Sequence, residues 1–241
     1  MDETLHRAIT NSGIVIPTAR QQTLSPSLRT LHRRILRHFA DDATAPDPQL
    51  LGEWTRDLDV NLDTALGQLV AADLVEADPG RPARLLGAYP FSAITRGHAV
   101  QIQGGPTVQA YCAVDALGIS SMLGRDVIVS SSDPHTGEPI RVVVTEPQTA
   151  WQPDTTVMVL GSSRSCEPAA HCCRCPYINF HTSAANAHAH LQALDLTGPV
   201  LTQIQALDLA AFLFGDLLRP VAGTRPEDTT SSSTGDQSPR V

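Results

Sequence analysis

The chain has 241 residues, of which 25 are acidic and 17 are basic, and its formal net charge is -8. This length can bury the core of one large domain or of two small ones. The negative charge argues against nucleic acid and against an anionic membrane as partners. The sequence shows neither a signal peptide nor an uncharged apolar run long enough to span a membrane, so we expect a cytoplasmic location.

The first third of the chain predicts a small helical module. Residues 1–23 are interpreted as a polar N-terminal arm. Ser25 is then a suitable N-cap, with Pro26 at the first helical position and apolar residues recurring at helical spacing after it. Two further helices and a hairpin with a Pro/Gly turn follow, an order typical of a winged-helix-like module over residues 24–90. The expected helices span residues 26–39, 48–54 and 61–74.

The helix at residues 61–74 indicates whether this module binds DNA. A winged helix that reads DNA carries Lys and Arg on its second long helix, toward the groove. Here that helix carries Asp63 and Asp73 and neither Lys nor Arg. We therefore interpret the module as a packing or lid domain.

The remaining residues alternate between strand-like and helical patterns. Residues 91–222 predict a mainly antiparallel sheet, and residues 223–241 are so poor in apolar side chains that we expect a disordered tail. The predicted fold is therefore α+β, an N-terminal winged-helix-like helical module followed by a mainly antiparallel sheet domain with flanking helices. Strands are expected at residues 98–104, 125–132, 139–146, 155–161 and 177–183, and helices at residues 112–122, 183–194 and 207–220.

Three of the five cysteines stand close together in the stretch HCCRCPYINF, at Cys172, Cys173 and Cys175. Structural disulfides are not expected in a chain without an export signal. A closed zinc site needs a second pair of ligands, which the chain lacks, and neighbouring side chains rarely point at one ion. We interpret Cys166 as a small buried hydrophobic residue.

The fifth cysteine belongs to the stretch YCAVD, where Cys112 and Asp115 are three positions apart. On a helix, residues at this spacing share one face. The carboxylate can then take a proton from the thiol, or give one to a leaving group. Alone, the pattern also fits a buried cysteine followed by an aspartate in the first turn of a helix.

The two cysteine stretches together resemble the organomercurial lyase (alkylmercury lyase) family. The resemblance extends from Leu24 to Leu218. It includes GAYPFS at residues 87–92, the segment from Tyr111 to Val142, and CPYINFHTS at residues 175–183. The resemblance makes residues 91–222 the catalytic domain.

The resemblance implies three catalytic residues, Cys112, Asp115 and Cys175. Counting back from the NFHTS strand without a gap gives Cys175, whereas a slip of two residues gives Cys173, and Cys172 is a further alternative.

One position departs from the pattern of some family members. They carry another cysteine after the VSS strand, where this chain has Ser132 and Asp133. Because that cysteine is not one of the three core residues, its absence need not remove activity.

The family reaction is protonolysis, which converts R–Hg–X into R–H and Hg(II). Mercury is a soft ion that prefers thiolate ligands. The resemblance implies that Cys175 captures the organomercurial, that Cys112 is the second mercury ligand, and that Asp115 delivers the proton to carbon. An apolar pocket must then raise the pKa of Asp115. The Hg(II) product would be bound by the same three residues, with Cys173 as a further candidate ligand.

No cofactor is expected, because the reaction involves no net redox change and residues 104–107 form a hairpin turn rather than a phosphate-binding loop. The implied partners are an organomercurial substrate and, as acceptor of Hg(II), a small thiol or a mercuric reductase. The alternative is a winged-helix regulator that senses mercury or another soft metal without catalysis, which would not need Asp115. We interpret His188 and His190 as surface residues on different sides of a helix.

Overall fold

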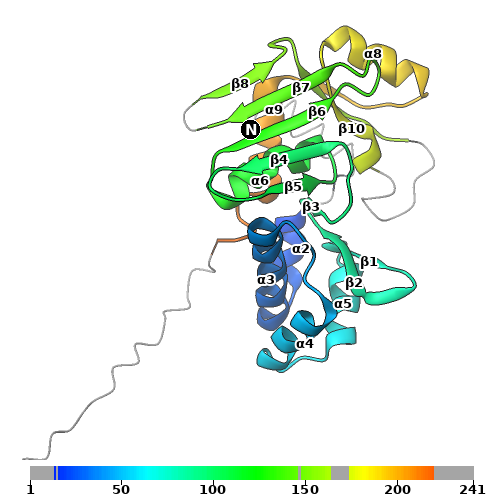
Figure 1. Cartoon of the computed structure of the whole chain (residues 1–241). Helices are drawn as coiled ribbons and strands as arrows, with labels where there is room; N and C mark the ends of the chain where they lie inside the picture. Colours follow the sequence, from blue (N-terminus) through cyan, green and yellow to red (C-terminus); the bar gives the residue numbers. More distant parts are fainter. Residues whose placement is uncertain (1–13, 15, 146–147, 164–173, 220–241) are drawn as a thin grey trace, which may run out of the picture.

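The computed structural model describes residues 14, 16–145, 148–163 and 174–219, and it has the expected α+β architecture (Figure 1). None of its helices is long and apolar enough to cross a membrane. The helices are α2 (Pro17–Thr23), α3 (Pro26–Asp42), α4 (Pro48–Asp57), α5 (Leu62–Ala71), α6 (Ala113–Leu123), α8 (Ala184–Ala193) and α9 (Gln203–Phe214), with a short 3-10 helix, η1 (Cys175–Tyr177).

Eight strands form the larger sheet, in the order β1-β2-β3-β5-β4-β6-β7-β8, and three form a second sheet, in the order β10-β9-β11. All neighbouring strands in both sheets are antiparallel. The strands are β1 (Val75–Asp78), β2 (Arg81–Ala88), β3 (Phe91–Ser92), β4 (His98–Ile102), β5 (Thr107–Ala110), β6 (Val127–Ser132), β7 (Pro139–Val144), β8 (Thr149–Gln152), β9 (Val157–Leu160), β10 (Ile178–His181) and β11 (Val200–Leu201).

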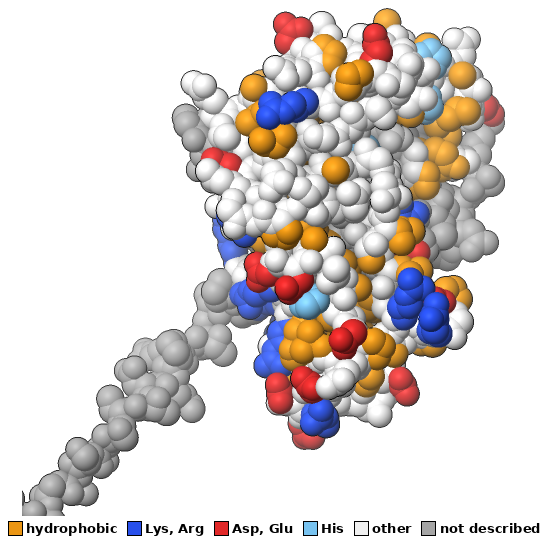
Figure 2. All heavy atoms as spheres, viewed as in Figure 1, with side chains coloured by type: hydrophobic (Ala, Val, Ile, Leu, Met, Phe, Trp, Pro, Cys, Tyr) orange, Lys and Arg blue, Asp and Glu red, His pale blue; other side chains and the backbone are white. Residues whose placement is uncertain are grey.

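Helices α3, α4 and α5 begin at side-chain caps, and the cap of α3 is the one that the sequence predicts. The hydroxyl of Ser25 accepts a hydrogen bond from the Leu28 amide at the start of α3, and Asp47 and Asn61 cap α4 and α5 in the same way. The order α3, α4, α5 and hairpin β1–β2 matches the expected order of elements, while the winged-helix interpretation stays a prediction. Acidic and basic side chains are interspersed over these helices on the face seen in Figure 2.

Helix α2, strand β8 and the start of α9 are among the elements that differ from the expectation. Helix α2 lies within the segment expected as an arm, because Gln21 is buried and its amide lies 2.8 Å from Nδ1 of His32 in α3. Strand β8 was not predicted, and α9 begins at Gln203, four residues earlier than expected, where Thr202 and Gln205 form a capping box. The predicted disordered tail lies outside the described residues.

The larger sheet joins the helical module to the rest of the chain. Phe91 of β3 pairs with Ala88 of β2 on one side and with Ala110 of β5 on the other. The expected boundary between residues 90 and 91 therefore falls inside a continuous sheet. This continuity fixes the hairpin β1–β2 relative to the residues that follow β5.

Helix α6 is buried between α9 and the sheet, where it contacts β4, β5 and β6. Its residues are apolar on nearly every side, as expected for a helix without a solvent-exposed face. Gly118 lets α9 approach closely, because a Cβ atom at this position would lie 2.2 Å from Cδ2 of Phe214. A glycine at position 118 is therefore required by the packing of the two helices.

We predict that Gly118→Ala destabilises the protein by about 1–3 kcal/mol, because the added methyl group overlaps the Phe214 ring in a closely packed core. Urea unfolding under reducing conditions measures the change. The matched control is Gly67→Ala in α5, where a Cβ would meet nothing within 4 Å. There we expect a gain of about 0.5–1 kcal/mol. Equal effects of the two substitutions would contradict the packing argument.

Candidate active site

Cys112 and Asp115 are brought together by the start of helix α6. Cys112 is the N-cap residue and has an extended backbone, with φ of -154°. Asp115, in the first turn, accepts hydrogen bonds from the backbone N–H of Cys112 and from its thiol. Cys112 Sγ lies 2.8 Å from Asp115 Oδ2. The C-x-x-D spacing thus places the carboxylate over the N-cap, as the acidic residue of a capping box does.

Cys175 reaches the same carboxylate from η1. Its Sγ lies 3.8 Å from Asp115 Oδ2, although the two residues are 60 positions apart. Gly161 at the end of β9 fixes η1 in place by donating a hydrogen bond of 3.1 Å to the carbonyl of Tyr177. A Cβ at Gly161 would lie 2.4 Å from that oxygen, so only glycine permits this approach.

The structure therefore brings together Cys112, Asp115 and Cys175, with one ligand atom of each within 4.8 Å of the others. This is the one such group of His, Cys, Asp and Glu side chains in the described part of the chain. The alternatives Cys172 and Cys173, and also Cys166, lie outside the described residues.

The three side chains are almost completely shielded from solvent, with exposed fractions of 1% for Cys112, 3% for Asp115 and 7% for Cys175. They border a small cavity of about 40 Å³. Its other lining residues come from residues 14–89 and from residues 114–214, and most of them are apolar or aromatic: Ile14, Pro17, Asp73, Tyr89, Val114, Arg174, Ile178, Leu213 and Phe214.

Comparison with known proteins identifies this arrangement. The sequence model of the alkylmercury lyase family matches residues 91–215, which is over half of the chain and includes all three residues. The chain belongs to the alkylmercury lyase family. Its fold is similar to the crystal structure of the mercury-bound form of MerB2, with 23% sequence identity and a TM-score of 0.69, covering 84% of this chain and 97% of that one. A search of curated proteins found no match.

Burial sets the ionisation of the lyase's acidic groups. Removal from water raises the pKa of Asp115 to about 7, although hydrogen bonds from Cys112 and Cys175 act in the opposite direction. Burial likewise raises the pKa of the Cys112 thiol well above its ordinary value. For Cys175 the hydrogen bond with Cys112 lowers the pKa, but burial and the charge of Asp115 outweigh it, so the pKa is raised. The expected rise for Asp115 is confirmed.

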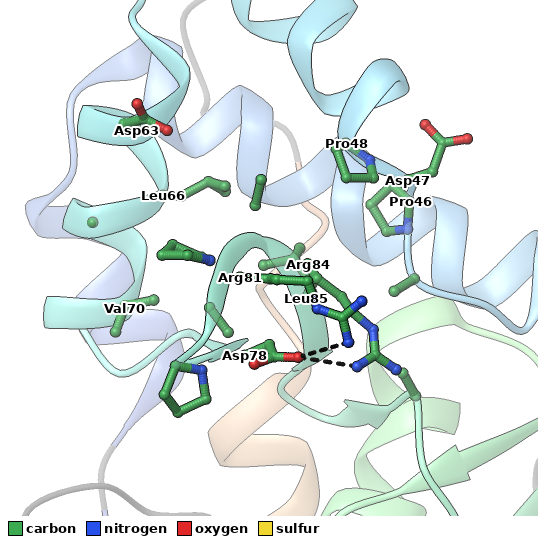
Figure 3. A pocket seen from close by; sticks show the side chains of 17 residues that line it. Pro46, Asp47, Pro48, Asp63, Leu66, Val70, Asp78, Arg81, Arg84 and Leu85 are labelled. Atoms are coloured by element: carbon green, nitrogen blue, oxygen red, sulfur yellow. Dashed lines mark hydrogen bonds and ion pairs between the residues drawn. The ribbon is translucent and has the colours of Figure 1, made fainter.

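A much larger cavity lies elsewhere, between α5 and the hairpin β1–β2 (Figure 3), and has a volume of about 1250 Å³. Leu66 and Val70 of α5 face Leu85 of β2 across it. Its charged side chains include Asp78, which pairs with Arg81 and Arg84 of the same hairpin. It contains no thiol, so volume alone does not identify the reactive site.

Sequence analysis did not predict a second buried polar cluster, around Asp133. Its carboxylate accepts hydrogen bonds from the amides of His135 and Thr182, both at 2.8 Å, and lies 3.0 Å from Nδ1 of His181. Asp133 and His181 are completely buried. The cluster ties the end of β6 to the end of β10, which follows η1. The turn sequence at residues 133–138 was the feature of the sequence that could have pointed to this cluster.

His188 and His190 differ in their exposure. His188 is exposed on α8, as expected. His190 is half-buried, and its ring centroid lies 5.1 Å from that of His181. The interpretation of His190 as a simple surface residue is therefore incomplete.

We predict that Asp115 makes folding stability depend on pH. Because its native pKa is about 7 and the unfolded value is about 3.8, the native state keeps a proton that the unfolded chain releases. Stability therefore falls as the pH rises from about 4 to about 7. Asp115→Asn should remove this fall, so the stability of the variant relative to wild type should rise between pH 5 and pH 8 by on the order of 2 kcal/mol.

Urea unfolding of both proteins at several pH values, with reducing agent present, measures this difference. Asp63→Asn, an exposed position on α5, is the control and should show no such trend. A constant difference between Asp115→Asn and wild type across this range would mean that Asp115 does not carry the raised pKa.

Proposed function

We propose that this lyase cleaves the carbon–mercury bond of R–Hg–X by protonolysis, with Cys175 as first nucleophile, Cys112 as second mercury ligand and Asp115 as proton donor. The observation that carries the proposal is the position of Asp115 Oδ2, which lies 2.8 Å from one sulfur and 3.8 Å from the other. One oxygen can therefore exchange a proton with either thiol and with a carbon atom bound between them.

In the first step Cys175 replaces the group X. A bond forms between Cys175 Sγ and mercury, the Hg–X bond breaks, and the thiol proton leaves with X. Two observations favour Cys175 for this role. It is the most exposed member of the group, and its sulfur is farther from Asp115 than that of Cys112.

In the second step Cys112 adds to mercury while carbon leaves. The thiol proton of Cys112 passes to Asp115, the Cys112 Sγ–Hg bond forms, and Asp115 delivers one proton to carbon as the Hg–C bond breaks. The products are R–H and Hg(II) bound by two thiolates, and mercury is neither oxidised nor reduced. A pKa of about 7 suits this relay, because Asp115 can both accept and donate a proton near neutral pH.

The small cavity beside the thiols is the proposed site of the R group. Val114 from α6 and Leu213 from α9 line it with apolar surface. A saturated or aromatic R group is thereby removed from water, while the mercury end faces the sulfurs. The low volume of about 40 Å³ favours small R groups.

The alternative of a DNA-binding metal sensor is less well supported. Helix α5 carries Asp63 and no basic residue, and Figure 2 shows charges of both signs mixed over the helical module. A sensor also has no use for a carboxyl group that is buried against both thiols. We therefore retain the catalytic function alone.

We predict that the purified protein releases methane from methylmercury in the presence of excess small thiol. Cys112→Ser, Cys175→Ser and Asp115→Asn should each lower the rate by at least about 100-fold, because each removes a mercury ligand or the proton donor. Gas chromatography of the headspace measures methane.

Cys173→Ser is the matched control, because the same chemical change falls outside the proposed triad. We expect it to keep most of the activity. Methane formation that survives Cys175→Ser and disappears with Cys173→Ser would assign the role of first nucleophile to Cys173. No methane from wild type would refute the proposed reaction.

We further predict that Leu213→Ala shifts the substrate preference toward bulkier R groups. The shorter side chain enlarges the cavity, so the ratio of kcat/KM for phenylmercury to that for methylmercury should rise at least about fivefold. Leu209→Ala on the same helix is the control, because Leu209 is fully buried without lining the cavity. An equal change of the ratio in both variants would place the R group elsewhere.

A further inference from the structure

A second cavity borders Cys175. Its volume is about 180 Å³, and its lining residues are Arg96, His98, Tyr111, Cys175, Pro176 and Asn179. Cys175 lines this cavity and the small apolar one, whereas Cys112 and Asp115 line only the apolar one. Pro176 is exposed and the Arg96 side chain is 26% exposed, so solvent reaches this second cavity.

Polar side chains supply part of the lining of the second cavity, but the Tyr111 hydroxyl already donates to Glu76 and the Asn179 amide to the Pro176 carbonyl. The guanidinium of Arg96 is its charged group and lies 5.1 Å from the centroid of the Tyr111 ring. Nη2 of Arg96 pairs with Glu76 at 3.1 Å, but the buried Nε–H has no hydrogen-bond partner in the described part of the chain. Asn179 adds an amide, and burial keeps His98 neutral by lowering its pKa to about 4. No acidic side chain is among the described lining residues.

Glu76 holds Arg96 in this place. Its carboxylate also accepts a hydrogen bond of 2.6 Å from the hydroxyl of Tyr111. Gly87 makes room for that hydroxyl, because a Cβ at this position would lie 2.1 Å from it. Since an arginine has five N–H donors and Glu76 engages one end of the guanidinium, donors remain for a ligand.

We propose that this second cavity binds the small thiol that removes Hg(II), and that it selects thiols bearing a carboxylate. The inference rests on the proposed function, because it concerns the product of that reaction. The carboxylate would bind the guanidinium of Arg96, and the sulfur of the thiol would then reach mercury beside Cys175, which lines both cavities. Substrate and acceptor thiol would thus occupy different cavities that share Cys175.

The removal step is a thiol exchange at mercury. The sulfur of the incoming thiol forms a bond to mercury, the bond between mercury and Cys175 Sγ breaks, and the thiol proton ends on Cys175. A second thiol displaces Cys112 in the same way. Mercury remains Hg(II) throughout, so neither oxidant nor reductant takes part.

The test uses full-length protein loaded with one equivalent of Hg(II). Mercaptoacetate, 2-mercaptoethanol and cysteamine are added at equal thiolate concentration, and the mercury retained after rapid gel filtration gives each removal rate. We expect the anionic thiol to act faster than the neutral one by on the order of tenfold, and the cationic thiol to be slowest. The formal net charge of -8 favours the opposite order, so a preference for the anion must be local.

Substitutions of Arg96 locate the preference. Arg96→Gln should bring the anionic-to-neutral ratio close to one, and Arg96→Lys should keep most of it. Arg84→Gln is the matched control, because Arg84 also forms an ion pair, on β2 and away from the thiols. A ratio that is unchanged in Arg96→Gln would overturn the proposal.

The comparison of the three thiols on wild-type protein tests the proposed cavity function even if a variant fails to fold. Equal rates for the three thiols, or fastest removal by cysteamine, would overturn the proposed cavity function. These measurements start from added Hg(II) and need no catalysis. Methane formation from methylmercury by wild type tests the proposed reaction separately. A failure of the proposed cavity function can therefore be told apart from a failure of the proposed reaction.

Discussion

The contact between Asp115 and the two thiols is the constraint on which the rest of the site depends. A carboxyl group almost completely removed from water is costly when charged, so burial raises the pKa of Asp115 to about 7. The same burial disfavours both thiolates. In the proposed function mercury would reverse this situation, because a soft cation bound by two thiolates cancels the charges that the site cannot hold when empty. That function therefore accounts for the burial of three acidic groups at one place.

Two close backbone approaches hold this geometry. Helix α6 carries two of the three groups, and Gly118 lets α9 pack against it. Cys175 depends on the short helix η1, which Gly161 ties to the end of β9. Neither glycine touches a reacting atom. Each instead allows two elements to pack closely beside the site, in which Cys175 Sγ lies 3.8 Å from Asp115 Oδ2.

Local patterns in the sequence predicted the elements and only part of the site. Most helices and strands can be predicted from caps such as Ser25 and from the spacing of apolar residues, because these signals act over a few residues. Helix α2 was not predicted, and its Gln21 packs against His32 of α3, a contact that no local pattern shows. The spacing of Cys112 and Asp115 predicts that they meet.

The pairing of that motif with Cys175 came from the family resemblance. No local rule connects residues 60 positions apart. The cluster of Asp133 and His181 shows the same limit, because a turn sequence predicts the turn but not the strand that packs against it. Long-range packing therefore decides which polar residues share a site.

The helical module contributes residues to the lining of the candidate site. Asp73 and Tyr89 from this module line the apolar cavity together with Cys112 and Cys175. Glu76 of β1 binds both Arg96 and Tyr111, which border the second cavity. The continuous sheet through β2, β3 and β5 makes these contacts possible, because it leaves no flexible linker between module and site. A module that supplies walls to both cavities needs no nucleic-acid partner to account for its presence.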